Sequence, residues 1–118
     1  MRTILIVDDD ARFRAQARDL LIDHEFVVVG EAVDGASAIT STRSLRPDVV
    51  LLDIGLPDVD GFTVAESLAS EGSPPMVVLT SSRDARAYGR RLRNSHAIGF
   101  IPKEQISAMA MHALVDRE

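Results

Sequence analysis

Side chains that can do chemistry follow the ends of four short apolar runs in this chain. The runs are residues 3–7, 49–52, 76–79 and 97–101, and they lead to Asp8 and Asp9, Asp53, Thr80 and Lys103. Continuous apolar runs of this length predict strands that are buried on both faces. The carboxyl ends of parallel strands meet at one edge of a sheet, where α/β proteins bind ligands. We therefore expect these polar groups to converge at one edge.

Three carboxylates at one edge repel one another, and their pKa values rise unless a cation neutralises them. Mg²⁺ suits such a site because it prefers hard oxygen ligands and keeps several waters. A carboxylate nucleophile beside Mg²⁺, a lysine and a hydroxyl fits phosphoryl transfer, which depends on positioning and charge neutralisation. We predict that Asp53 attacks phosphorus to form an acyl phosphate. Asp8 and Asp9 would bind the metal, and Thr80 and Lys103 would hold phosphoryl oxygens.

Composition excludes several other classes of site. The chain has 118 residues, which suits one domain over residues 1–118, and it has no cysteine for a disulfide or a thiolate metal site. A net charge of −5 argues against direct nucleic-acid binding by this domain. No apolar run is long enough to span a membrane, and a strand starting at residue 3 leaves no room for a signal peptide. We expect a cytoplasmic protein.

Helical patterns separate the predicted strands. Strands are expected at 3–7, 26–29, 49–53, 76–79 and 97–101, and helices at 11–23, 35–45, from Gly61 to before Gly72, at 83–93 and at 105–115. Strands that alternate with helices at this spacing indicate βαβ units and a parallel sheet. The predicted architecture is an α/β three-layer sandwich of five strands and five helices.

Two predicted helices have an ambiguous exposed face. The segment 83–93 is rich in arginine and has few apolar anchors, chiefly Tyr88 and Leu92, so it is either a loosely held element that shifts or an ordinary solvated helix. The last helix has two apolar rows. We expect Ile106, Met109, Ala110, Ala113 and Leu114 to face the core. Ala108, Met111 and Val115 then form either a partner surface or scattered exposed residues.

The ordered set of motifs resembles the receiver domain of bacterial two-component response regulators over essentially the whole chain. Each motif is weak alone, but their order at successive strand ends is highly specific. The matching pieces are Val7-Asp8-Asp9, Leu52-Asp53 followed by Pro57 and Gly61, Leu79-Thr80, and Gly99-Phe100-Ile101-Pro102-Lys103. The resemblance implies a flavodoxin-like sheet with strand order 2-1-3-4-5.

The resemblance also implies roles for individual residues. Asp53 would accept a phosphoryl group from a sensor histidine kinase, or from a small donor, with Mg²⁺ as cofactor. Asp8, Asp9, Asp53 and the backbone carbonyl of Gly55 would bind the metal, with Asp9 a more direct ligand than Asp8. Lys103 would bind the phosphoryl group, and Thr80 and Phe100 would form the switch pair. Such a domain catalyses only its own phosphorylation and dephosphorylation.

The Gly-Phe-Ile-Pro-Lys segment is similar to that of receivers fused to LuxR-type or NarL-type DNA-binding domains. We expect a transcriptional output domain outside these residues, although a stand-alone receiver is the other interpretation. Expected partners are the kinase and a second copy of the chain. Glu104 follows Lys103 and Pro102 precedes it, whereas relatives often have proline directly after the lysine. Gly55 lacks the side chain that in relatives affects how readily water reaches the phosphoryl group. Ser81 is small, as in relatives, and should leave room beside the phosphoryl group.

Two other functions fit parts of the pattern. A Mg²⁺-dependent phosphohydrolase with an aspartyl-phosphate intermediate would use the same nucleophile. Phosphatases of the haloacid dehalogenase type have a second acid two residues later, where this chain has Gly55, which argues against that function. A pseudo-receiver that binds partners without phosphorylation is the third candidate. The complete set of Asp8, Asp9, Asp53, Thr80 and Lys103 argues against it.

Overall fold

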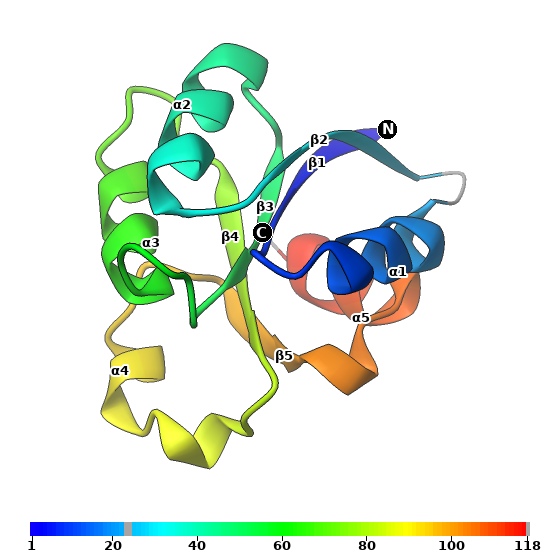
Figure 1. The fold of residues 1–118 in the computed structure, drawn as a ribbon. Coiled ribbons are helices and arrows are strands. Elements are labelled where there is room, and N and C mark those ends of the chain that lie inside the picture. The colour runs from blue at the N-terminus through cyan, green and yellow to red at the C-terminus, as the bar shows by residue number, and fades with distance from the viewer. Residues whose placement is uncertain (23–24, 118) are drawn as a thin grey trace.

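The computed structural model describes residues 1–22 and 25–117, and a five-stranded sheet runs through its centre (Figure 1). The strands are β1 (Arg2–Val7), β2 (Phe26–Ala32), β3 (Val49–Asp53), β4 (Met76–Ser81) and β5 (Gly99–Pro102). All neighbouring strands pair in parallel, in the order β2-β1-β3-β4-β5. This confirms the flavodoxin-like fold class and the strand order.

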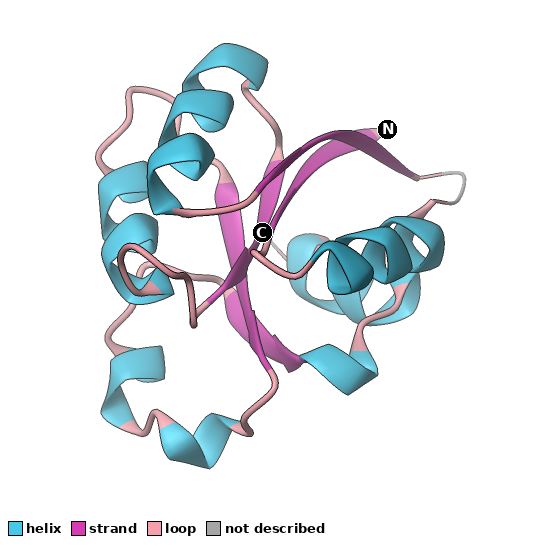
Figure 2. Ribbon diagram, viewed as in Figure 1, coloured by secondary structure: helices cyan, strands magenta, loops and turns pink. Residues whose placement is uncertain are grey.

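Helices cover both faces of the sheet and complete three layers (Figure 2). Helices α1 (Ala11–Leu21) and α5 (Ala108–Val115) lie on one face. The other face carries α2 (Gly35–Leu45), α3 (Gly61–Ala69) and α4 (Arg90–Arg93). Two 3₁₀ turns, η1 (Ala85–Ala87) and η2 (Lys103–Gln105), precede α4 and α5. In the described part of the chain, no helix combines the length and the apolar character that a membrane span requires.

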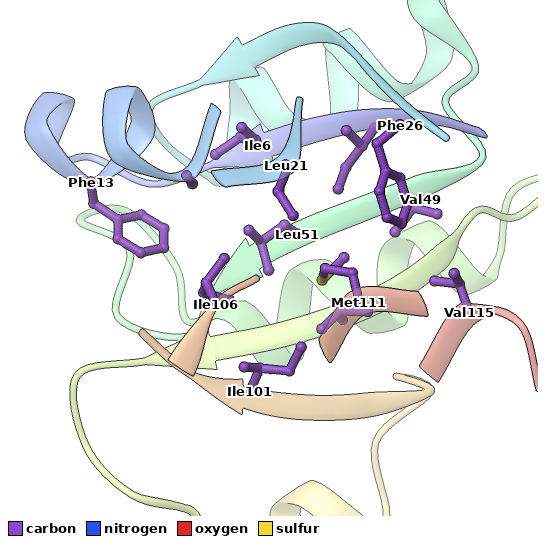
Figure 3. Packing of buried hydrophobic residues seen from close by; sticks show 13 residues of the cluster. Ile6, Phe13, Leu21, Phe26, Val49, Leu51, Ile101, Ile106, Met111 and Val115 are labelled. Carbon is purple, nitrogen blue, oxygen red and sulfur yellow. The ribbon is translucent and has the colours of Figure 1, made fainter. Parts of the chain in front are cut away.

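Two apolar clusters form because side chains alternate between the faces of each strand. Ile6 and Leu51 point toward α1 and α5 and pack against residues such as Phe13 and Met111 (Figure 3). Leu52, next along the strand, belongs to the cluster on the opposite face. All five residues of β3 are buried, so this central strand holds its last residue, Asp53, in a fixed position at the edge of the sheet.

Acidic side chains cap the helices that lead away from this edge. Asp10 accepts a hydrogen bond from the Arg12 amide and is the N-cap of α1. Asp34 forms a capping box with Ser37 at the start of α2. Asp60 caps α3. These caps fix where each helix begins and therefore fix the loops that surround the site.

The structure differs from the predicted element boundaries at several places. Strand β2 continues to Ala32, three residues beyond its predicted end, because it keeps pairing with β1 up to the contact of Val7 with Ala32. Strand β5 begins at Gly99 instead of residue 97. Helix α1 ends at Leu21, and the predicted end of that helix, Asp23, lies outside the described residues.

The predicted helix over 83–93 is wrong in extent. It is broken into η1 and α4 by Gly89, whose φ of 54° is a left-handed conformation that favours glycine and interrupts a helix. Neither short helix contains a buried residue. The expectation that this segment has few anchors in the core is therefore confirmed, with Tyr88 and Leu92 packing at the edge of the cluster beneath it.

The predicted core row of the last helix is only partly right: Ile106 is buried and Ala110 and Leu114 pack against the core, but Met109 and Ala113 are exposed. Ser107 caps α5, so the helix begins at Ala108 and Ile106 lies before it in extended backbone. The row at spacings of three and four from Ala108 then faces the sheet, and Met111 and Val115 are fully buried. Met109, placed in the core row by the sequence pattern, is 82% exposed. The proposed partner surface on Ala108, Met111 and Val115 is therefore part of the core.

Candidate functional site

Asp53 stands at the end of β3 and is 5% exposed. Its neighbour in register on β4 is Thr80, and its Oδ1 accepts a hydrogen bond of 3.1 Å from the Gly55 amide. The other carboxylate oxygen, Oδ2, lies 3.5 Å from the Lys103 ammonium. The loop after β3 and Lys103, which follows β5, therefore hold the Asp53 carboxylate from two sides.

Two further carboxylates from the β1–α1 loop meet Asp53. Asp8 is fully buried, Asp9 is exposed, and each of the three side chains offers an oxygen within 4.8 Å of the other two. The Asp8 carboxylate is fixed because its Oδ1 accepts from the Asp10 amide at 2.9 Å and its Oδ2 lies 2.6 Å from Lys103 Nζ. The structure thus brings together the acids that the sequence analysis expected at one edge.

Lys103 reaches this cluster from the start of η2, directly after Pro102 at the end of β5. Its ammonium bridges Asp8 and Asp53 and lies 4.6 Å from the centre of the Phe13 ring, a cation–π arrangement. The order Pro102-Lys103-Glu104 therefore still delivers the lysine to the carboxylates, because η2 turns the chain immediately after the strand.

Burial dominates the electrostatics of Asp53. Desolvation raises its pKa, the negative charge of Asp8 raises it further, and the Gly55 amide and Lys103 only partly oppose this. Burial also works against the charge of Lys103. Its hydrogen bond to Asp8, with the charges of Asp53 and Asp8, outweighs that effect and raises its pKa. One ammonium among three acids leaves an excess of negative charge that favours an added cation.

The donor set fits Mg²⁺. All of the converging groups offer hard carboxylate oxygens, the chain has no cysteine thiolate, and one acid of the three is exposed to solvent. Exposure of Asp9 leaves room for the waters that Mg²⁺ retains.

Thr80 is fully buried beside Asp53, and among the described residues its Oγ1 has no hydrogen-bond partner. A buried hydroxyl without a partner is costly, and it marks a group that can donate to an added ligand. The next residue, Ser81, is also buried, and its Oγ shares a 2.5 Å hydrogen bond with the Tyr88 hydroxyl. From the sequence, Ser81 was expected only to leave space beside the phosphoryl group; its contact with Tyr88, the single tyrosine of the chain, was not predicted.

Phe100 does not lie in the carboxylate cluster. It is half-buried on β5, its ring centre is 6.2 Å from that of Tyr88, and the Tyr88 ring in turn contacts Phe62 edge-on at 5.7 Å. Tyr88 thus links the two residues of the predicted switch pair: its hydroxyl binds Ser81, the neighbour of Thr80, and its ring lies near that of Phe100.

Two glycines shape the loop after β3 in opposite ways. A Cβ at Gly61 would lie 2.6 Å from the Asp53 carbonyl oxygen and 2.7 Å from Ile54 Cα, so only glycine permits this close approach. A Cβ at Gly55 would meet only Asp53 Oδ1, at 3.9 Å. The loop is therefore packed tightly against the Asp53 backbone at Gly61 and has space for a side chain at Gly55.

Comparisons with known proteins agree with this geometry. Residues 4–116 match the family model of the response regulator receiver domain. The transcriptional activator EvgA of Escherichia coli K12 is 30% identical over 101 residues, covering 86% of this chain and 50% of that protein. BvgA of Bordetella pertussis, a putative positive transcription regulator of virulence factors, is 35% identical over 102 residues, covering 86% of this chain and 49% of that protein. The chain spans about half the length of these relatives.

Solved structures share the fold. The receiver domain of the putative response regulator NarL from Mycobacterium tuberculosis has a TM-score of 0.84 and 31% identity, over 96% of this chain and 95% of that one. The matched family model extends over nearly all of the sequence and includes every strand end described above. The chain therefore belongs to the response regulator receiver domain family.

Proposed function

We propose that residues 1–118 form one receiver domain that accepts a phosphoryl group on Asp53 from a sensor histidine kinase and changes its binding surface as a result. The observation that carries this proposal is the contact of Asp53 Oδ2 with Lys103 at 3.5 Å, beside two acids and the unpartnered Thr80 hydroxyl. These groups are a nucleophile, a cation and a hydroxyl donor suited to one phosphoryl group.

In the proposed reaction, an Asp53 carboxylate oxygen forms a bond to phosphorus while the bond from phosphorus to the donor histidine nitrogen breaks. The histidine leaves with the electron pair of that bond and becomes neutral by taking a proton. Asp8, Asp9, Asp53 and the Gly55 carbonyl would hold Mg²⁺, which supplies charge neutralisation for the phosphoryl oxygens. Lys103 would form an ion pair with one phosphoryl oxygen, and Thr80 would donate its hydroxyl to another.

The proposed switch begins at Thr80. Movement of its hydroxyl toward the phosphoryl group shifts the backbone that carries Ser81, and Phe100 turns inward to fill the space. Phosphorylated and unphosphorylated chains would be two populations of one fold, and the acyl phosphate would favour the active one. The chain would act on no external substrate beyond its own phosphorylation and dephosphorylation.

The proposed output is transcriptional and lies outside these residues. EvgA and BvgA are named as transcription regulators, and the chain matches about half of each. The receiver itself carries a net charge of −5, which disfavours direct contact with nucleic acid. We propose a cytoplasmic location, a kinase as the upstream partner, and a second copy of the chain as a partner of the phosphorylated form.

Intact-protein mass spectrometry tests the proposal. After incubation with Mg²⁺ and acetyl phosphate, the wild-type chain is expected to gain one phosphoryl group that hydroxylamine removes. Asp53→Asn is the matched control because it keeps the shape of the side chain and should gain none. An adduct of equal yield in Asp53→Asn would contradict the assignment of the site. Absence of an adduct in the wild type would favour a pseudo-receiver.

A further inference from the structure

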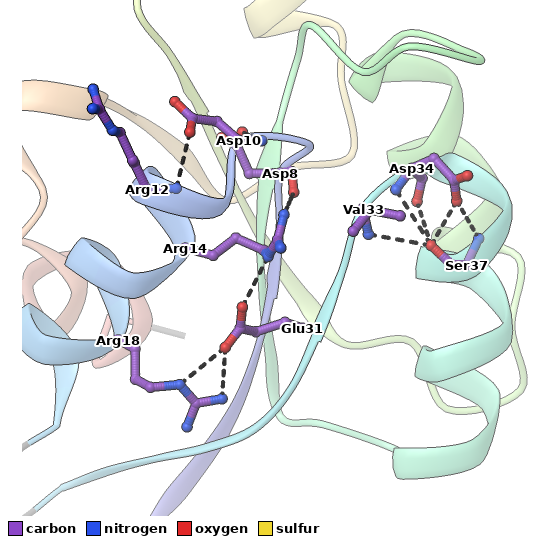
Figure 4. A network of polar contacts seen from close by, with 9 residues as sticks. All are labelled: Asp8, Asp10, Arg12, Arg14, Arg18, Glu31, Val33, Asp34 and Ser37. Carbon is purple, nitrogen blue, oxygen red and sulfur yellow. Dashed lines mark hydrogen bonds and ion pairs between the residues drawn. The ribbon is translucent and has the colours of Figure 1, made fainter.

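Arg14 of α1 connects the acidic loop to the edge strand of the sheet. Its Nε donates to Glu31 Oε1 on β2 at 2.8 Å, and its Nη1 donates to the Asp8 backbone carbonyl at 2.8 Å (Figure 4). The Arg14 side chain is only 16% exposed. One planar guanidinium therefore fixes the distance between β2 and the loop that carries Asp8 and Asp9.

Glu31 is a fixed anchor for this guanidinium because Arg18 binds its second oxygen. Arg18 Nε and Nη2 donate to Glu31 Oε2 at 3.0 and 2.8 Å. The hydrogen bonds from Arg18 and Arg14 outweigh desolvation and hold the pKa of Glu31 below its usual value. Arg14 and Arg18 thus share one carboxylate, but only Arg14 continues to Asp8.

The carbonyl that Arg14 binds belongs to the peptide between Asp8 and Asp9. In the preceding peptide, between Val7 and Asp8, the Asp8 amide donates to the Ala32 carbonyl at 3.0 Å. Among the described residues, Arg14 is the hydrogen-bond donor to the Asp8 carbonyl, and the Asp9 carboxylate accepts no hydrogen bond. The orientation of this peptide sets where the Asp9 side chain points, so a change at Arg14 reaches Asp9 directly.

We infer that Arg14 is a positioning residue that holds the Asp8–Asp9 peptide so that both carboxylates can bind a divalent cation together with Asp53. Arg14 and Arg18 share the Glu31 carboxylate, so removing either arginine removes one positive charge, and a comparison of the two isolates the contact of Arg14 with the Asp8 carbonyl. This inference rests on the proposed function, because it concerns the acids proposed to hold Mg²⁺. An outer group that orients metal ligands in this way typically contributes tenfold or more to metal affinity.

Calorimetric titration with Mg²⁺ of the wild type, Arg14→Met and Arg18→Met separates positioning from fold stability. Both variants lose an ion pair to the same Glu31 carboxylate, but only Arg14→Met also releases the Asp8 carbonyl. The expected Kd for Mg²⁺ rises about tenfold in Arg14→Met and stays within about twofold of wild type in Arg18→Met. At saturating Mg²⁺, phosphorylation of Arg14→Met by acetyl phosphate should return close to the wild-type rate, since Arg14 does not touch the phosphoryl group.

Equal Mg²⁺ affinities of the two variants would overturn the inference and leave the proposed function intact. Absence of Mg²⁺ binding by the wild-type chain would overturn both. Unfolding midpoints of the variants show whether each is folded at the titration temperature. If Arg14→Met does not fold, Arg14→Lys and Arg18→Lys provide the same comparison. The single ammonium of Arg14→Lys cannot bind Glu31 and the Asp8 carbonyl at once, as the planar guanidinium does. Equal Mg²⁺ affinities of Arg14→Lys and Arg18→Lys would therefore also overturn the inference.

Discussion

At the scale of single residues, the carboxylate cluster is electrostatically unfavourable in the folded protein. Asp8 and Asp53 are buried within reach of one lysine, so two negative charges share one positive charge in a dry environment. Burial and the charge of Asp8 raise the pKa of Asp53. A group whose folded-state pKa is raised stabilises the fold in its protonated form and loses that contribution as pH rises through the folded pKa.

Asp53→Asn should therefore stabilise the protein without Mg²⁺, by about 1 kcal/mol at pH 7. The amide keeps the shape of the side chain and removes the repulsion from Asp8. Below the unfolded pKa of about 3.9, Asp53 is protonated in both states, so the two proteins should differ least. Urea unfolding of both proteins at a series of pH values measures the difference, which should grow as pH rises above about 4. A difference that does not change with pH would contradict this account of Asp53.

Sequence reasoning predicted well where the candidate site residues lie, because each follows a buried strand. Asp8, Asp53 and Thr80 are positioned by continuous apolar runs, whose register brings the strand ends together. The contacts of Ser81 with Tyr88 and of Arg14 with Asp8 could not be predicted in this way. They depend on how a helix or an irregular segment packs, which the spacing of residues along the chain does not specify.

At the scale of elements, the loop between β3 and α3 depends on Gly61. A Cβ there would lie 2.6 Å from the Asp53 carbonyl, against backbone that cannot easily move. Gly61→Ala is expected to lower the free energy of unfolding by about 2 kcal/mol, as overpacking typically does. Gly55→Ala is the matched control, since its Cβ meets only one atom at 3.9 Å, and it should change stability by less than about 0.5 kcal/mol. Chemical denaturation measures both, and equal effects would show that the close approach is not limiting.

The η1–α4 segment depends on the Tyr88 hydroxyl. Neither short helix buries a residue, and Tyr88 binds Ser81 while packing on Phe62 and Phe100. Removing this hydrogen bond with Tyr88→Phe should cost about 1 kcal/mol and speed amide hydrogen exchange over residues 82–98. Ser81→Ala should act in the same direction and cost more, because Ser81 Oγ also accepts a hydrogen bond of 3.1 Å from the Arg83 amide.

A double-mutant cycle on this pair tests the contact. Because each single variant removes the same hydrogen bond, Tyr88→Phe added to Ser81→Ala should cost much less than it does in the wild type. Additive losses would mean that the two hydroxyls are energetically independent.

The elements themselves were predicted with uneven success for physical reasons. The strands were recognised because buried parallel strands are continuous apolar runs. The prediction of one helix over 83–93 is wrong because Gly89, with its positive φ, interrupts that helix. The predicted core face of α5 is partly wrong because Ser107 caps the helix, which therefore begins at Ala108. The predicted row was counted from Ile106, but Ile106 lies before the helix in extended backbone. Helical spacing counted from Ala108 instead makes Met111 a core residue and leaves Met109 exposed.

At the scale of the whole molecule, a cation bound only by the folded state should raise the stability of the entire domain. Mg²⁺ at 100 times its Kd is expected to add about 2.7 kcal/mol to the free energy of unfolding. EDTA should reverse the effect, and Asp8→Asn should reduce it. Asp19→Asn, which removes an exposed acid of α1, is the matched control and should respond like wild type. Thermal unfolding at increasing Mg²⁺ measures this, and an equal response of Asp8→Asn and wild type would contradict the proposed metal site.

The central claim is that Asp53 carries the phosphoryl group, and borohydride reduction tests it most directly. Borohydride reduces an aspartyl phosphate to homoserine, which marks the residue that was modified. After treatment with Mg²⁺ and acetyl phosphate, reduction and peptide sequencing by mass spectrometry, the account predicts homoserine at position 53 and at no other acid. Homoserine at position 8 or 9, or a phosphoryl adduct that yields no homoserine at position 53, would contradict it.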